Sequence, residues 1–184
     1  MNKLIAIDQS SQRKYSEPSL VFTGSLYEPR TTLLNKISRG LSEHGISLDI
    51  KGRTMDTQRF SDDEYWINMA DSTMVLTTAN VMQCPNIDWP WFLHLVYRYL
   101  EVPATGSVLV AQEIPGLRRY LIPDVHYISY LSAEEAVNKI AYYWDKPKEL
   151  ERIAIAGKNK ARSLIDSGIY WVCIDTALKG DSLT

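Results

Sequence analysis

The chain has 184 residues, of which 45% are hydrophobic and 23% charged. This balance is typical of one globular domain with a layered core, and it argues against a mainly disordered protein. The formal charge of -2 and the pI near 5.9 argue against a dedicated nucleic-acid binder, which would carry a basic face. The two cysteines, Cys84 and Cys173, are too few and too far apart for a disulfide scaffold.

The N-terminal segment is mostly polar, and we expect residues 1–18 to be a lead-in to a single domain over residues 19–184. Its apolar run from Leu4 to Ile7 is stopped by Asp8. That run is too short for a signal peptide or a bilayer span. We therefore expect a cytoplasmic protein without an integral membrane segment, and peripheral membrane association stays open.

Apolar runs and helical spacing predict strands and helices in alternation. The first half is predicted to contain strands at 19–23, 46–50 and 72–78, and helices at 28–44 and 61–70. The second half is predicted to contain an irregular stretch at 79–90, helices at 91–104, 132–144 and 148–165, a turn and short helix at 116–120, and strands at 107–111 and 125–130. Ser61 with Glu64 and Ser132 with Glu135 have the spacing of capping boxes, which mark helix starts.

This alternation predicts an α/β fold with a parallel sheet covered by helices on both faces. In such a sheet the ligand crevice lies beyond the carboxyl ends of the strands. The predicted strand ends are Gly24-Ser25, Gly52-Arg53, Thr77 to Asn80 and Ala111 to Glu113. Small and hydroxylated residues at two of these ends suit a close approach of backbone N–H groups to phosphate oxygens.

Two short patterns are candidates for ligand binding. Gly24-Ser25, with Arg30 entering the next helix, suits a phosphate held by backbone donors and a guanidinium, but it also suits a simple strand-to-helix turn. Arg98 and Glu101 are three residues apart, on one predicted helical face among apolar neighbours. They are either a surface ion pair or a pair on the crevice rim, where the carboxylate would accept hydrogen bonds from ribose hydroxyls.

Other catalytic patterns find little support. The histidines His44, His94 and His126 have no metal-ligand spacing, although His94 stands one helical turn before Arg98. A Gly-x-Ser-x-Gly motif is absent, so a hydrolase triad has no anchor. A receiver-type signalling domain would need acids at the ends of its first and third strands. Those ends here read Thr-Gly-Ser and Thr-Thr-Ala.

With these residues in place, the chain resembles the nucleotide-binding half of a GT-B glycosyltransferase of the group 1 family, with a spore-maturation-protein-like C-terminal domain. The likeness covers roughly residues 19–165. It rests on an ordered set of segments: Val21 to Ser25 with Arg30, Asp63 to Tyr65, Ala70 to Ser72, Arg98 to Gly106, Pro123 to His126 with Tyr130, Glu134 to Ala136 with Ile140, and Ile153 to Gly157.

The resemblance implies a three-layer Rossmann-like domain that binds a nucleotide-diphosphate sugar, such as a UDP- or GDP-sugar, without a cofactor or bound metal. Glu101 matches the second acid of the Glu-x7-Glu pair of related retaining enzymes, which binds the donor ribose. Leu93 stands where the first acid would be, so the sugar-contacting residue is unassigned. The loop at 79–90 would approach the sugar, and no catalytic residue is assigned. The candidate ligand-binding residues are Gly24, Ser25, Arg30, Arg53, Asn80, Arg98 and Glu101.

GT-B enzymes also carry an N-terminal acceptor domain of similar size, whereas about 18 residues precede the first matching strand here. Two interpretations follow. In the first, the chain supplies the donor site of a glycosyltransferase, together with a separate N-terminal half or as a homo-oligomer. In the second, it is a non-catalytic module of the same fold that binds a nucleotide or a protein. The sequence does not decide whether the chain alone is an enzyme.

Overall fold

A computed structural model describes residues 15, 17–54, 60–79, 96–114 and 116–168. The strands in this part of the chain are β1 (Leu20–Ser25), β2 (Leu48–Arg53), β3 (Met74–Thr77), β4 (Val108–Gln112) and β5 (Ile128–Tyr130). The helices are α2 (Arg30–Glu43), α3 (Asp62–Ala70), α4 (Arg98–Ala104), α5 (Ala133–Trp144) and α6 (Pro147–Asp166), with a 3₁₀ turn η1 (Leu117–Arg119). The predicted alternation of strands and helices is confirmed.

The five strands form one parallel sheet in the order β2-β1-β3-β4-β5. After β1 the chain moves outward to β2 and then crosses back to β3 on the other side of β1. The strand order therefore reverses between β1 and β3, and this is where crevices open in such sheets. These two strands pair through Leu20 with Met74 and Val21 with Val75, so the ladder stops before their carboxyl ends.

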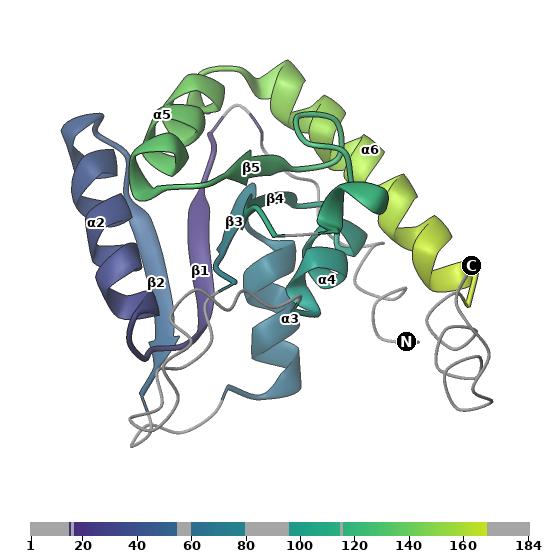
Figure 1. The fold of residues 1–184 in the computed structure, drawn as a ribbon, viewed down its shortest axis with the longest axis horizontal. Coiled ribbons are helices and arrows are strands. Elements are labelled where there is room, and N and C mark those ends of the chain that lie inside the picture. Colours follow the sequence, from purple (N-terminus) through teal and green to yellow (C-terminus); the bar gives the residue numbers. More distant parts are fainter. Residues whose placement is uncertain (1–14, 16, 55–59, 80–95, 115, 169–184) are drawn as a thin grey trace.

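Helices cover both faces of the sheet and make the three layers that were predicted (Figure 1). The first face packs against α2, α5 and the start of α6, around side chains such as Phe22 and Leu76. The second face packs against α3, α4 and η1, around side chains such as Val21 and Val75. Successive residues of a strand point to opposite faces, so the two cores share the same strands. The sheet is therefore buried on both sides.

The predicted helix starts follow from their capping residues. The Ser61 hydroxyl accepts a hydrogen bond from the Glu64 backbone, and the Glu64 carboxylate accepts one from the Ser61 backbone, which completes the capping box of α3. At α5 the Ser132 hydroxyl caps Glu135, but the Glu135 carboxylate accepts from the backbone N–H of Leu131. Both helices thus begin where the sequence predicts.

Several predicted boundaries differ from those of the structure. The strand expected at 125–130 begins at Ile128. Gly52 was expected to end a strand at 46–50, but β2 runs from Leu48 to Arg53 and Gly52 lies inside it. The Leu26 side chain packs directly on Gly52, where a Cβ would stand, so this glycine serves close packing. Of the helix expected at 91–104, residues 96 and 97 are not helical and α4 begins at Arg98, whereas residues 91–95 lie outside the described part of the chain. Tyr97 just before it is 71% exposed, and the inward spacing starts at Tyr99 and Val102.

Helix α6 lies against α4. At Gly157 a side chain would meet the His126 carbonyl, and an ideal Cβ there would stand 3.5 Å from the Cβ of Pro103 in α4. The Lys158 side chain in turn lies 3.3 Å from the ideal Cβ position of Gly106, just after α4. The close approach at Gly157 brings α6 directly over the helix that carries Arg98 and Glu101.

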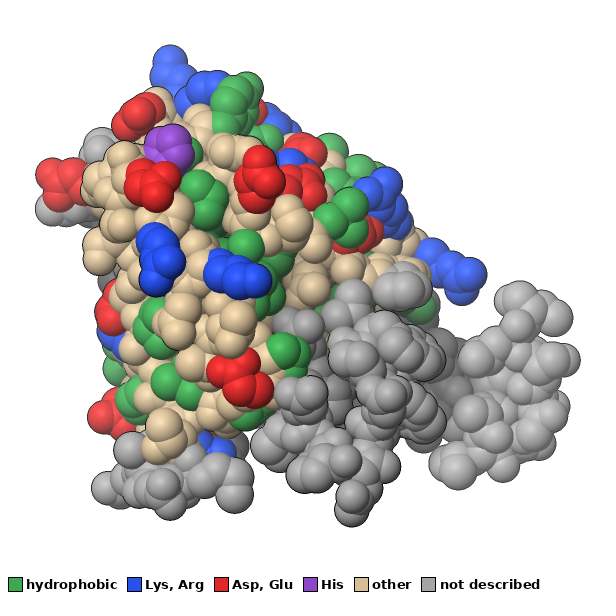
Figure 2. All heavy atoms as spheres, turned by 60° about the vertical axis from the view of Figure 1, so that its left-hand side comes forward, with side chains coloured by type: hydrophobic (Ala, Val, Ile, Leu, Met, Phe, Trp, Pro, Cys, Tyr) green, Lys and Arg blue, Asp and Glu red, His purple; other side chains and the backbone are tan. Residues whose placement is uncertain are grey.

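Figure 2 shows the face of the molecule around α2 and β2, where Lys and Arg side chains alternate with Asp and Glu. Charges of one sign do not gather on that face. No helix among the described residues is long and apolar enough to cross a membrane.

Several predictions fall outside the described residues. These are most of the lead-in, nearly all of the loop at 79–90, and the positions of Leu93 and His94. Tyr15, from the lead-in, packs against the first core, and its hydroxyl donates to the carbonyl of Gly106 at 3.5 Å. The domain boundary at residue 19 stays a prediction.

Candidate ligand pocket at the carboxyl ends of the strands

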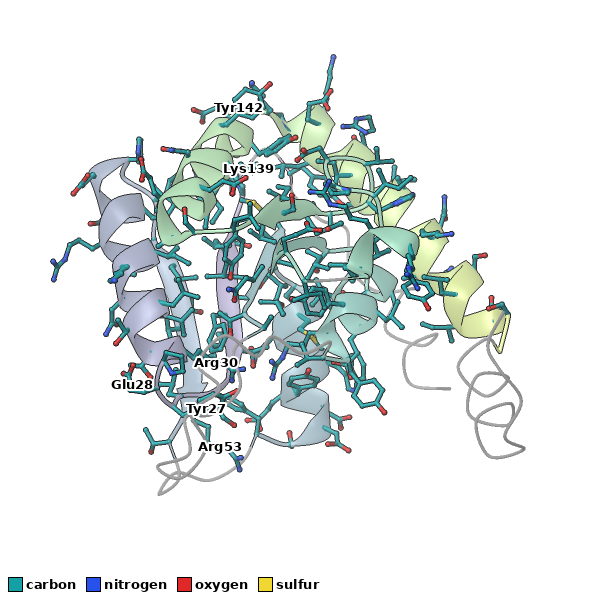
Figure 3. All side chains as sticks on the ribbon, in the orientation of Figure 1. Tyr27, Glu28, Arg30, Arg53, Lys139 and Tyr142 are labelled. Atoms are coloured by element: carbon teal, nitrogen blue, oxygen red, sulfur yellow. The ribbon has the colours of Figure 1, made fainter. Side chains whose placement is uncertain are left out.

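A pocket of about 720 Å³ opens beyond the carboxyl ends of β1 and β2, between α3 and α4. Small-molecule sites in proteins are commonly of this size, roughly 300–1,000 Å³. Among the lining residues are six of the seven predicted candidates: Gly24, Ser25, Arg30, Arg53, Arg98 and Glu101. Figure 3 shows Arg30 and Arg53 at this end of β1 and β2, at the far end of the molecule from Lys139 and Tyr142 of α5. The seventh candidate, Asn80, lies outside the described residues.

Arg30 is a buried arginine, 3% exposed. Its Nε donates to Oγ1 of Thr78 at 2.7 Å, and Nη1 donates to the carbonyl of Ser25 at 2.8 Å. Its guanidinium carbon lies 4.1 Å from the centre of the Tyr27 ring. Arg30 therefore ties the end of β1 to the residue just after β3, across the point where the two strands part.

Arg98 approaches the same place from α4. Its guanidinium lies against Gly24, where an ideal Cβ would stand 2.7 Å from Nη2. Gly24 has φ +150°, a backbone conformation that side chains disfavour. Glycine is thus required on two grounds, the backbone angle and the arginine that covers it. Burial lowers the pKa of Arg30, and the nearby charge of Arg98 lowers it further, so the two cations repel each other across Gly24.

Glu101 sits one helical turn after Arg98, and the hydrogen bond that fixes it comes from α3. The Tyr65 hydroxyl donates to Oε2 of Glu101 at 2.7 Å. Burial raises the pKa of Glu101, while the bond from Tyr65 and the charge of Arg98 act in the opposite direction. Burial also raises the pKa of Tyr65 to about 12. The Glu101 carboxylate is therefore held in a small hydrogen-bonded and charged network. It does not belong to a solvent-exposed surface ion pair.

Three buried side-chain atoms have no hydrogen-bond partner among the described residues: Oγ1 of Thr23, Oγ1 of Thr77 and Nε of Arg98. Both threonines are 0% exposed. Thr23 lies two residues before the end of β1, and Thr77 is the last residue of β3. Thr23 also lines the pocket. An unsatisfied buried polar group lowers the free energy of unfolding by about 1–3 kcal/mol. This loss of stability is therefore concentrated where β1 and β3 part.

The pocket also contains residues that were not among the candidate ligand-binding residues. Aromatic side chains make up much of its wall: Tyr27, Phe60, Tyr65, Trp66 and Tyr97. Tyr65 and Trp66 stack edge to face, with ring centres 5.6 Å apart. A usable signal was present, because a helix that follows a strand in a parallel sheet begins at the carboxyl edge. The capping box at Ser61 therefore already placed the first turn of α3 near the crevice.

The remaining candidates lie elsewhere or stay untested. His126 lies away from the pocket wall, and its Nδ1 accepts a hydrogen bond from the backbone N–H of Ile122. His44 follows the last turn of α2 and is exposed. Within the described ranges, no group of three or more His, Cys, Asp or Glu side chains is placed to hold a metal ion.

Solved glycosyltransferase structures share this fold. The C-terminal domain of a group 1 family glycosyl transferase from Francisella tularensis aligns with a TM-score of 0.59 and 11% identity, over 86% of this chain and 90% of that domain. Sucrose-phosphate synthase from Thermosynechococcus elongatus aligns with a TM-score of 0.62 and 10% identity, over 95% of this chain and 51% of the synthase. An alpha1,3-fucosyltransferase aligns with a TM-score of 0.59 and 10% identity, over 85% of this chain and 42% of the enzyme. The chain thus spans about half of the two whole enzymes.

At these identities the structural likeness establishes the fold, which is that of the C-terminal domains of GT-B glycosyltransferases. No curated protein matches the sequence itself. A family model described as glycosyl transferase-like matches residues 30–166, which include Arg30, Arg98 and Glu101. Because that match spans most of the sequence, the chain belongs to the glycosyl transferase-like family.

Proposed function

We propose that this chain binds a nucleotide-diphosphate sugar, such as a UDP- or GDP-sugar, and supplies the donor site for glycosyl transfer. The observation that carries the proposal is the approach of two arginines to the end of β1, Arg98 against Gly24 and Arg30 at the Ser25 carbonyl, with Glu101 one turn farther along α4. Two cations that repel each other gain from an anion placed between them. A carboxylate beside such an anion suits the hydroxyl groups of a ribose.

Within this proposal the two arginines have different tasks. Arg30 already donates to Ser25 and Thr78, so it fixes the site and adds positive potential. Arg98, whose Nε lacks a partner among the described residues, is the better candidate for direct phosphate contact. Arg53 reaches the same wall through a 3.4 Å contact with the Ser25 hydroxyl. The proposal therefore assigns Arg98 to a ligand contact.

The chemistry follows from these positions. An acceptor oxygen forms a bond to the anomeric carbon of the donor while the bond from that carbon to the diphosphate oxygen breaks. The electron pair leaves with the diphosphate, and the proton of the acceptor hydroxyl passes to the departing diphosphate or to a base of the half that holds the acceptor. Guanidinium groups stabilise the charge that develops on the departing diphosphate. Three arginines, Arg30, Arg53 and Arg98, line the pocket beside two carboxylates, Asp62 and Glu101.

Transfer also needs an acceptor site, and we propose that a second Rossmann-like half supplies it. The fucosyltransferase and the sucrose-phosphate synthase are each about twice as long as their aligned regions, which cover 42% and 51% of them. The alternative is a non-catalytic nucleotide-binding module. The donor-site proposal expects a sugar nucleotide to be hydrolysed, or its sugar transferred, when a candidate partner chain is added. The non-catalytic alternative expects neither.

The test is thermal denaturation with UDP, GDP, UDP-glucose and GDP-mannose. A ligand at 100 times its Kd stabilises the folded state by about 2.7 kcal/mol. We expect at least one of the four to raise the midpoint, and Arg98→Met and Glu101→Gln to reduce that rise without unfolding the protein. The absence of any rise for all four ligands would falsify the donor-site proposal.

A further inference from the structure

Glu101 is held by a residue of another helix, and this contact suggests a task that goes beyond the proposed donor site. Tyr65 lies in α3 and Glu101 in α4, 36 residues apart in the sequence. The Tyr65 hydroxyl donates to Oε2 of Glu101 at 2.7 Å. Its ring stands under Arg98, with 5.9 Å between the guanidinium carbon and the ring centre. One tyrosine thus contacts both charged residues of α4.

The position of Tyr65 is itself fixed. The capping box of Ser61 and Glu64 sets the start of α3, and the backbone N–H of Tyr65 donates to the Ser61 carbonyl at 3.0 Å. The ring packs edge to face on Trp66 and against the second core. A phenol held in this way has little freedom to leave Glu101, because its ring torsions are set by packing.

We propose that Tyr65 is a positioning residue: its hydroxyl occupies Oε2 of Glu101, keeps the carboxylate ionised and leaves Oε1 to receive a ribose hydroxyl. This inference rests on the proposed donor function and goes beyond it, because neither the family match nor the predicted site residues include a role for Tyr65. The substrate class is a ribonucleoside diphosphate sugar, recognised through its ribose.

The electrostatics agree with this geometry. The groups that face Glu101 are Tyr65 from α3 and Arg98 from its own helix, with Asp62 of α3 and Arg53 of β2 on the same pocket wall. Burial raises the pKa of Glu101, and the Tyr65 hydrogen bond is the largest opposing influence. A ribose hydroxyl donates better to a carboxylate than to a carboxylic acid. Binding should therefore weaken as pH falls through the pKa of Glu101, and loss of the phenol should move that weakening to higher pH.

The experiment measures binding of UDP-glucose and GDP-mannose by calorimetry between pH 5 and pH 8. Sugar nucleotides are chosen because the terminal phosphate of a free diphosphate titrates near pH 6, as phosphate monoesters do, at about 6. We expect Tyr65→Phe to shift the midpoint of the affinity loss upward by about half a unit to one unit. At the acidic end its affinity should be roughly three- to tenfold below that of the unaltered protein.

Two controls separate positioning from folding. Tyr99→Phe removes a buried hydroxyl from α4 itself, one that donates to the Gln112 carbonyl at 2.8 Å, and it should leave the midpoint unchanged. In a Glu101→Gln background the pH dependence should flatten, and Tyr65→Phe should then produce no shift. A second measurement uses the ligand-free protein. The carbon-13 chemical shift of the Glu101 carboxyl should titrate at higher pH in Tyr65→Phe than in the unaltered protein.

The outcomes are distinguishable. If the unaltered protein binds neither sugar nucleotide at any pH, the donor function fails, and the ligand-side task of Tyr65 fails with it. If it binds but Tyr65→Phe weakens binding equally at every pH, Tyr65 has only a structural role and the inference is overturned. An unchanged midpoint in both the binding and the carboxyl titrations overturns it as well, while leaving the donor function in place.

Discussion

The two faces of the sheet are built from the same strands but differ in kind. The core against α2 and α5 is dominated by aliphatic side chains such as Leu34, Ile37 and Ile140. The core against α3 and α4 contains Tyr65, Tyr99 and Tyr127, and it adjoins the unpartnered hydroxyls of Thr23 and Thr77. A one-residue step along β1, from Phe22 to Thr23, leads from one core to the other. The contrast indicates that the core against α2 and α5 mainly stabilises the fold. The core against α3 and α4 contributes less stability because it also forms the pocket.

The largest effect is expected from the aliphatic face. Ile37 in α2 is 0% exposed, and Ile37→Ala removes buried apolar volume and leaves a cavity. Unfolding free energy should fall by about 2–5 kcal/mol, measured by urea titration. The affinity of the folded fraction for a sugar nucleotide should stay within a factor of two, on the order of additivity error for distant sites. A matching loss of affinity would show that the two faces are not separate.

The two arginines of the pocket should separate stability from binding. Arg30→Met removes hydrogen bonds to Ser25 and Thr78, and unfolding free energy should fall by about 1.5–3 kcal/mol. Arg98→Met removes a guanidinium with an unpartnered Nε, so stability should change little. Affinity for the sugar nucleotide should drop roughly ten- to a hundredfold instead. Urea titration and calorimetry on both variants check this, and interchanged effects would assign the arginines the other way round.

Gly24→Ala tests whether the surface under Arg98 belongs to the site. The backbone angle at Gly24 should cost about 1–3 kcal/mol of stability, and the new methyl group should displace the Arg98 guanidinium, which lies 2.7 Å away. Gly45→Ala is the matched control, because Gly45 has φ +70° with nothing within 4 Å of an ideal Cβ. Both variants should be destabilised in thermal denaturation. Only Gly24→Ala should lose nucleotide binding, and equal binding in both would separate Arg98 from the ligand.

The smallest effect should come from the two threonines, and its sign is informative. Thr23→Val and Thr77→Val each replace an unpartnered buried hydroxyl with a methyl group of the same shape. Unfolding free energy should rise by up to about 1 kcal/mol, while ligand affinity falls. Thr78→Val is the control, because its hydroxyl accepts from Arg30 and its loss should destabilise. Destabilisation by all three variants would mean that the hydroxyls of Thr23 and Thr77 are satisfied in solution.

Much of the fold was predictable because local patterns carry it. The Ser61 and Ser132 caps located two helix starts, and apolar runs located the five strands within one or two residues at most ends. The start of α4 was not predictable in this way. The residues just before Arg98 are mostly apolar, so they have no polar side that would fix a helical period. The sequence therefore does not indicate that α4 begins after Tyr97.

The candidate site was predicted in part. Strand-end reasoning brought together Gly24 and Arg53, and the helical spacing and the resemblance added Glu101; all three line one pocket. The partner of Glu101 was expected to be Arg98 on the same helix, but the hydrogen bond comes from Tyr65 on α3. Contacts between helices depend on how the elements pack, and a single sequence does not encode that in any local spacing. Asn80 stays a prediction because it lies outside the described residues.

The close contact of α6 with α4 has a consequence for the order in which the protein is made. Helix α4 carries Arg98 and Glu101, and it lies under Gly157 and Lys158 of α6. A ribosome releases α6 after every other described element. While the chain is still emerging, all five strands have been made, but the helix that packs against the end of α4 at Pro103 and Gly106 has not. A nascent chain stopped before residue 147 would therefore lack Leu150, Ile153 and Ala154 of the aliphatic core as well as the helix that packs on α4.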